Sequence, residues 1–127
     1  MNSKSKIVLA VVVGTAFGAA AVQGLHAQAK PKAYTVSELQ TLDAAANAAF
    51  VPLVVKAQEA AGGRNLKTGG GKIVGMEGTA PKRVAITEWN SLDQAEAFYK
   101  SKAWSDLAPQ RNKALKTIRR YAVEAVN

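Results

Sequence analysis

The chain has 127 residues, of which 17 are Lys or Arg and 9 are Asp or Glu, and its formal net charge is +8. It contains no Cys, and its single His is His26. These counts exclude disulfides, Cys nucleophiles and, beyond position 26, His-based triads and the His or Cys ligands of ordinary zinc and haem sites. We therefore expect neither a metal site nor a cofactor in the folded domain.

Residues 1–29 have the pattern of an export signal. Lys4 and Lys6 give a basic start, residues 7–22 are apolar and uncharged, and Ala27-Gln28-Ala29 matches a signal-peptidase site. The apolar run is shorter than the about 20 residues that cross a bilayer, so an uncleaved anchor is the weaker alternative. Cleavage after Ala29 leaves residues 30–127, or 127 − 29 = 98 residues. We expect them to form one domain in the periplasm or outside the cell, without stable membrane insertion.

The first part of this domain predicts a strand followed by a helix. Residues 33–39, AYTVSEL, alternate as a strand does. Residues 43–61 are rich in Ala and precede Gly62-Gly63, which is typical of a helix and its C-terminal stop. Pro52 lies inside this segment and has no backbone N–H, so we expect a kink or a restart of the helix near Phe50.

A glycine-rich segment comes next. Residues 64–68 and 72–77 predict short strand pieces, and Gly69-Gly70-Gly71 between them predicts a bend or a bulge. Neither a following helix nor a GK[ST] sequence accompanies these glycines, which disfavours a phosphate-binding loop. Residues 79–82 contain Pro81 and predict a turn.

Residues 83–107 carry the clearest pattern in the chain. RVAITEW at 83–89 places β-branched and aromatic residues at period two, which predicts a strand. Ser91 is a good N-cap for a helix with Gln94 three residues on, and that helix has one apolar stripe, formed by Leu92, Ala95, Phe98 and Tyr99. A second short turn is expected before a stop near Pro109. Residues 110–117 continue as helix or loop, and residues 118–126 predict the last strand.

The resulting order is strand, helix, strand, strand, helix, strand. This order suits an α+β domain in which an antiparallel sheet carries both helices on one face. The opposite face is partly apolar and needs a cover. A domain of this size without disulfides is also marginally stable alone. We therefore expect a homodimer in which a second copy packs sheet to sheet.

The spacing of several short motifs resembles the domain of unknown function 1330 family, in the dimeric α+β barrel (ferredoxin-like) superfamily. The resemblance covers residues 33–126 and rests on Ala33-Tyr34, Gly62-Gly63-Arg64, Gly69-Gly70, Glu77-Gly78, Pro81-Lys82-Arg83, Glu88-Trp89, Tyr99-Lys100-Ser101, Trp104 and Arg111. Asn65 stands where the family usually has an aromatic residue, Thr68 where it often has Arg, and Trp104 where Tyr is usual. The resemblance implies a ferredoxin-like βαββαβ fold and a dimer, for a family without a settled activity.

Two carboxylates are candidates for acid–base chemistry. Glu38 and Glu88 share strand parity with the apolar residues Val36 and Ile86, and a partly covered carboxyl can have a raised pKa. The two Glu residues are expected at opposite ends of the sheet, which disfavours a dyad that shares one proton. The alternative for each is a strand-end Glu that reaches solvent or pairs with an Arg.

The candidate ligand-binding residues combine charge with aromatic surface: Arg64, Glu88, Trp89, Tyr99, Trp104 and Arg111. Arg64, Arg83 and Arg111 suit an anionic group, or else form ion pairs with Glu77, Glu88 or Asp106. The aromatic residues line a cavity between helix and sheet, or else are ordinary core. A basic cluster near the C-terminus is interpreted as a solvated face rather than a nucleic-acid site, and comprises Lys113, Lys116, Arg119 and Arg120.

Three functions remain open from the sequence. The first is a binding module that holds a small molecule in a sheet–helix cavity. The second, implied by the resemblance, is a cofactor-independent monooxygenase or isomerase, with Glu88 as base and Tyr99 or Arg111 beside a developing oxyanion. The third is a structural or interaction protein without a ligand site. The sequence does not decide whether the protein is an enzyme.

Overall fold

The computed structural model describes residues 30–126, so the expected export signal and its cleavage site lie outside the described residues. Within this range, the strands form one antiparallel sheet in the order β2-β3-β1-β4. Their bounds are Ala33–Thr41 for β1, Arg64–Asn65 for β2, Arg83–Trp89 for β3 and Leu115–Glu124 for β4. Among these residues, no helix is both long enough and apolar enough to cross a membrane.

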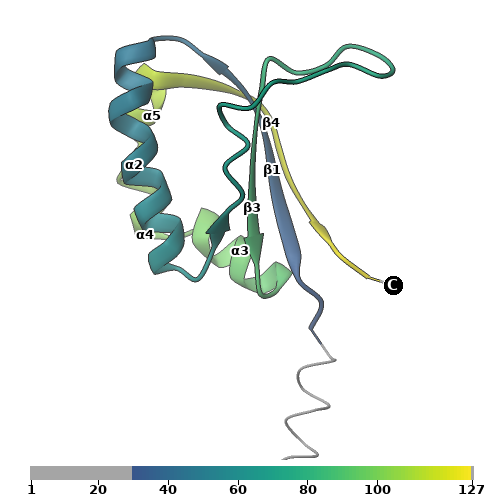
Figure 1. Cartoon of the computed structure of the whole chain (residues 1–127). Helices are drawn as coiled ribbons and strands as arrows, with labels where there is room; N and C mark the ends of the chain where they lie inside the picture. Colours follow the sequence, from purple (N-terminus) through teal and green to yellow (C-terminus); the bar gives the residue numbers. More distant parts are fainter. Residues whose placement is uncertain (1–29, 127) are drawn as a thin grey trace, which may run out of the picture. The chain divides into compact units, whose positions relative to one another are not determined.

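Helices cover one face of this sheet (Figure 1). They are α2 at Ala44–Ala60, α3 at Leu92–Tyr99, α4 at Lys102–Ser105 and α5 at Ala108–Ala114. The order of the elements and the strand order confirm the predicted α+β, ferredoxin-like βαββαβ fold. The long crossovers through α2 and through α3–α5 place both helical connections on the same side, as predicted.

Side-chain caps explain where the helices begin. The Asp43 side chain accepts a hydrogen bond from the backbone N–H of Ala46 at 2.8 Å and starts α2. Ser91 starts α3 in the same way, with the backbone N–H of Gln94 as donor at 3.2 Å. The Gln94 side chain in turn accepts from the backbone N–H of Asn90 at 2.8 Å. The predicted capping pattern is therefore present, with Asn90 rather than Ser91 as the backbone donor.

The restart expected at Pro52 and the stop expected near Pro109 were wrong. α2 continues through Pro52 as one element, without a restart near Phe50. Pro52 and Ala48, the residue whose carbonyl loses its helical partner, are both exposed, so water can hydrogen-bond to that carbonyl. Pro109 does not end a helix either, because it occupies the first turn of α5, where the missing N–H has no helical partner to lose.

The strand predictions for residues 66–77 were also wrong. β2 ends at Asn65, and the positive φ of 60° at Lys67 interrupts the extended backbone. The chain stays beside β3 as far as Thr68, whose Oγ1 donates to the Val84 carbonyl at 2.7 Å. The following segment, residues 66–82, has no regular secondary structure; it first runs beside β3 and then projects as a loop beyond the end of the sheet, away from α2 (Figure 1). We call it the arm. Val74 and Met76 on it are 62% and 87% exposed, so they lack the neighbouring strand that pairing requires.

Two hydrophobic clusters fill the space between sheet and helices. The first is built on Leu39, Phe50, Ala114 and Leu115, and the second on Trp89, Ala95 and Phe98. Trp89 is completely buried, and its indole Nε1 donates to Thr35 Oγ1 at 3.0 Å. The Phe98 ring lies 5.3 Å from the Trp89 ring, centroid to centroid. The two clusters leave a gap between them, and that gap is the cavity described below.

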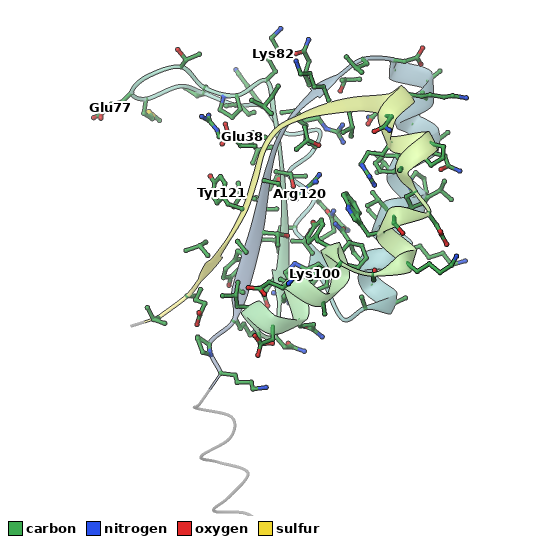
Figure 2. The ribbon with its side chains drawn as sticks, turned by 180° about the vertical axis from the view of Figure 1, so that it is seen from behind. Glu38, Glu77, Lys82, Lys100, Arg120 and Tyr121 are labelled. Carbon is green, nitrogen blue, oxygen red and sulfur yellow. The ribbon has the colours of Figure 1, made fainter. Side chains whose placement is uncertain are left out.

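The other face of the sheet carries no helix. The register aligns Tyr34 and Val36 of β1 with Val123 and Tyr121 of β4 on this face. Val123 and Tyr121 are 52% and 50% exposed. Figure 2 shows Tyr121 and Arg120, which are neighbours in β4, on opposite sides of the sheet. The single chain therefore leaves this partly apolar face of the sheet exposed to solvent.

Candidate functional site

A cavity of ≈ 60 Å³ lies between the sheet and α2, at the junction of the two core clusters. The sheet contributes small and polar residues, and α2 contributes one apolar side. Its main wall residues are Ser37, Leu39, Phe50, Val54, Gln58, Arg83, Ala85, Tyr99, Trp104, Arg111 and Arg120. A space of this size accommodates a few water molecules or a compact ligand, because one water molecule needs about 10–15 Å³ of cavity volume.

Gln58 is the most unusual residue of this wall. It lies on α2 and is 6% exposed, and its Oε1 atom has no hydrogen-bond partner among the described residues. A buried acceptor without a donor costs roughly 1–3 kcal/mol. That cost is avoided when a bound molecule supplies the donor. The sequence pattern missed Gln58 because a Gln in a helix is ordinarily exposed.

Aromatic rings form the wall opposite α2. The Tyr99 and Trp104 rings are 4.8 Å apart in an edge-on arrangement, between the end of α3 and α4. The guanidinium of Arg111 lies over the Trp104 ring at 4.0 Å, and its Nη1 donates to the Trp104 carbonyl at 3.2 Å. Burial lowers the pKa of Arg111, which nevertheless stays charged. The structure thus brings Tyr99, Trp104 and Arg111 together at the cavity.

The other three candidate ligand residues lie elsewhere. Trp89 is fully buried in the second core cluster rather than at the cavity. Glu88 and Arg64 face the open side of the sheet, because they follow the opposite strand parity from Thr87 and Asn65. The six residues therefore do not form one site.

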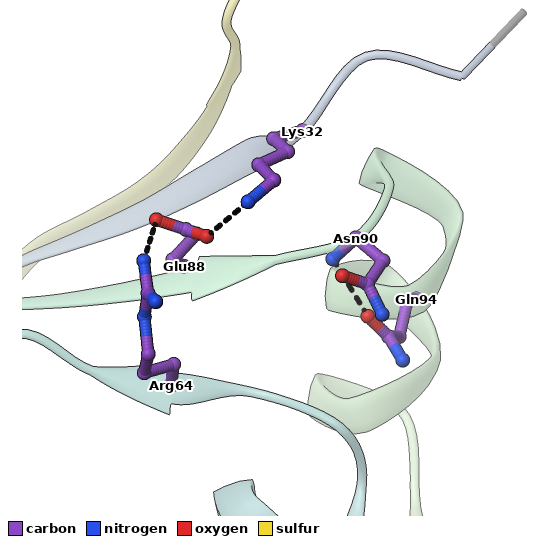
Figure 3. Close-up of polar contacts among 5 residues, drawn as sticks. All are labelled: Lys32, Arg64, Glu88, Asn90 and Gln94. Carbon is purple, nitrogen blue, oxygen red and sulfur yellow. Dashed lines mark hydrogen bonds and ion pairs between the residues drawn. The ribbon is translucent and has the colours of Figure 1, made fainter. Parts of the chain in front are cut away.

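Glu88 is neutralised by two cations (Figure 3). Lys32 Nζ donates to one carboxylate oxygen at 2.8 Å, and Arg64 Nη2 donates to the other at 2.5 Å. These bonds, first that from Lys32 and then that from Arg64, hold the pKa of Glu88 below its usual value despite partial burial. A carboxylate with a lowered pKa is a weak base at neutral pH. The geometry therefore favours the ion-pair alternative for Glu88 over the catalytic one.

Glu38 is paired in the same way. Arg119 binds it through two parallel bonds, from Nε at 3.0 Å and from Nη2 at 2.6 Å. The hydrogen bonds from Arg119 lower the pKa of Glu38. The register places Glu38 opposite Val84 and Glu88 opposite Tyr34, so the two carboxylates lie toward opposite ends of the sheet, as expected. They form no dyad.

Residues of the basic cluster separate in the structure. Arg119 and Arg120 are neighbours in β4 and point to opposite faces, so Arg119 pairs with Glu38 while Arg120 reaches the cavity. Strand alternation at residues 118–121 is the signal that could have assigned Arg120 to the helix side. Among the described residues, no group of three His, Cys, Asp or Glu side chains is arranged to hold a metal ion.

The solved structures most relevant here share the fold at low identity. A protein of unknown function from Rhodopseudomonas palustris, RPA0582, matches with 14% identity and a TM-score of 0.57, over 77% of this chain and 85% of that chain. SnoaB, a cofactor-independent oxygenase from Streptomyces nogalater, matches with 12% identity and a TM-score of 0.51, over 76% of this chain and 95% of that chain. At these identities the similarity shows a shared fold. No curated protein matches the chain significantly.

The family model agrees with the fold and extends across the whole domain. The model described as "Domain of unknown function (DUF1330)" matches residues 32–126, from the residue before β1 to the end of the described chain. This range contains every strand of the sheet and every wall residue of the cavity. The chain therefore belongs to the DUF1330 family.

Proposed function

We propose that this protein is an exported homodimer that binds a small organic molecule in the cavity between its sheet and α2. The observation that carries the proposal is a cavity walled by Tyr99, Trp104 and Gln58, where the buried Oε1 of Gln58 has no hydrogen-bond partner among the described residues. Ligand sites commonly combine apolar walls with a few convergent polar groups. A purely structural core would fill this space with apolar side chains instead.

Two features outside the cavity support the other parts of this proposal. The open sheet face presents Tyr121 and Val123 to solvent, and a second copy would bury them. The start of the chain has the pattern of a cleaved export signal: a basic beginning, an apolar run and then Ala27-Gln28-Ala29. An exported domain without Cys has no disulfides to stabilise it, so dimerisation is a reasonable source of additional buried surface.

Native mass spectrometry of protein purified from the exported fraction tests all three parts. The expected spectrum shows a dimer, lacks the mass of residues 1–29 and carries a reproducible additional small mass. Arg111→Ala should lose that additional mass. Arg64→Ala is the matched control, because Arg64 lies on the open side of the sheet and should leave it unchanged. Loss of the additional mass in both variants, or in neither, would contradict the assignment of the cavity.

A cofactor-independent enzyme is the second candidate. It is favoured by the shared fold with SnoaB, a cofactor-independent oxygenase, and by Tyr99 and Arg111 at the same cavity. Glu88 does not suit the role of base, since it is ion-paired on the other side of the sheet. Tyr99 is then the candidate proton-transfer group. Turnover of a quinol with oxygen uptake, abolished in Tyr99→Phe, supports the enzyme; binding without turnover in the same assay rejects it.

A further inference from the structure

The cavity is lined by three arginines and by no carboxylate. Arg83 comes from β3, Arg111 from α5 and Arg120 from β4, so three separate elements deliver positive charge to one small space. No Asp or Glu is among the wall residues. By contrast, Arg64 and Arg119 on the open side of the sheet are each paired with a Glu.

Within residues 30–126, none of the three cavity arginines forms an ion pair. Arg83 donates from Nε to the Gly69 carbonyl at 2.8 Å and from Nη1 to Asn47 Oδ1 at 2.7 Å. Arg120 donates from Nε to Ser37 Oγ at 2.9 Å. These acceptors are all neutral. They orient the guanidinium groups but leave their charges uncompensated.

Aromatic rings hold two of these arginines close to each other. The Trp104 ring has Arg111 at 4.0 Å and Arg120 at 4.6 Å, and Arg120 also lies 5.1 Å from the Tyr99 ring. Burial lowers the pKa of Arg120; the neighbouring Tyr99 raises it in part, and repulsion by Arg111 lowers it. The rings attract the guanidinium groups through cation–π contacts, but an aromatic ring adds no net negative charge. A bound anion would remove the repulsion between the two cations.

We propose that the cavity binds a compact hydroxycarboxylate, with its carboxylate held by Arg111 and Arg120 and its hydroxyl donating to Gln58 Oε1. The proposal rests on the proposed binding function and names its ligand class. Arginine binds carboxylates through paired hydrogen bonds, and Gln58 Oε1 is the acceptor that lacks a donor. Arg83 adds a third positive charge at the same wall.

The remaining walls decide the size and the organic character of this ligand. Leu39, Phe50 and Val54 give the cavity an apolar side that suits carbon rather than an inorganic oxyanion. The volume of ≈ 60 Å³ suits a ligand of few heavy atoms better than a large aromatic acid. Glycolate, with five heavy atoms, is the simplest molecule that carries both required groups.

Isothermal titration calorimetry of the purified protein with four probes tests the proposal: glycolate, acetate, glycolamide and inorganic phosphate. We expect glycolate to bind with a dissociation constant in the millimolar range or tighter. Acetate should bind about tenfold more weakly, because it cannot donate to Gln58 Oε1. Glycolamide and phosphate should bind at least tenfold more weakly than glycolate, because the first lacks the charge and the second lacks carbon.

Variants locate the binding. Arg120→Gln and Arg111→Gln should each weaken glycolate binding about tenfold or more, while Arg64→Gln, the same change on the other side of the sheet, should not affect it. Circular dichroism checks that each variant is folded, and the comparison of probes on the unmodified protein does not depend on any variant.

The possible failures are distinguishable. Equal binding of glycolamide and glycolate would overturn the anion site while leaving small-molecule binding intact. Tighter phosphate than glycolate binding would overturn the organic ligand. No binding of any probe, together with an additional small mass in the native spectrum, would overturn the ligand class but retain the proposed function. No binding and no additional mass would reject both.

Discussion

Trp89 is expected to be the side chain on which the stability of this domain depends most. It is completely buried, its Nε1 donates to Thr35 Oγ1 at 3.0 Å, and its ring packs 5.3 Å from Phe98. Truncation of a buried Trp to Ala costs about 3–5 kcal/mol, through lost apolar contacts and the cavity left behind. Domains of this size are stable by only about 5–15 kcal/mol, so Trp89→Ala should remove a large part of the total.

Trp89→Phe separates the hydrogen bond from the packing. It retains an aromatic ring beside Phe98 but removes the donor to Thr35, and the loss of that hydrogen bond should contribute about 0.5–1.5 kcal/mol. The cost of Trp89→Phe should therefore lie well below that of Trp89→Ala. Both variants should retain ligand binding if they fold, because Trp89 is not a wall residue of the cavity.

Urea unfolding followed by far-ultraviolet circular dichroism measures both costs, since replacing Trp89 changes the fluorescence signal itself and leaves only Trp104 as an indole. All proteins are compared at one concentration, because the stability of the proposed dimer would depend on concentration. Trp104→Phe serves as a control at an aromatic residue that is only half-buried. A Trp89→Ala variant within about 1 kcal/mol of the unmodified protein would refute the assignment of Trp89 to the core.

Three further predictions follow from single contacts. Gly63→Ala should destabilise the fold by about 1–3 kcal/mol in the same urea assay, because a Cβ there would lie 2.8 Å from the Trp89 ring. Ser91→Ala should cost about 1 kcal/mol by removing the cap of α3, with Ser91→Asp as the variant that restores it. The lowered pKa values of Glu38 and Glu88 stabilise the folded state above the ordinary Glu value of 4.5, and this stabilisation is lost as pH falls through the lower folded values. Thermal melts should therefore show less acid destabilisation in a Glu38→Gln, Glu88→Gln double variant, and an unchanged acid profile would contradict the two ion-pair assignments.

Much of the fold was determined by local sequence pattern. The strand at Arg83–Trp89 and the helix that follows Ser91 agree with the structure, because period-two alternation and capping are properties of neighbouring residues. The βαββαβ order followed from the same local signals together with the need to bury one face of the sheet. The prediction of a strand at residues 72–77 was wrong, because a strand forms only where another strand lies beside it. The local sequence does not contain that information.

The cavity, in contrast, was decided by tertiary structure. Tyr99, Trp104 and Arg111 were recognisable as candidates, but their contact depends on how α3 and α5 pack on β4 and how α4 packs on α3. Gln58 and Arg120 become cavity residues only because α2 packs on the sheet face to which the Arg120 side chain points. Glu88 and Trp89 illustrate the same limit: adjacent in sequence, they face opposite sides of β3, where one meets two cations and the other an aromatic core. Sequence alternation separates the two faces, and only the packing of distant segments determines which face holds the site.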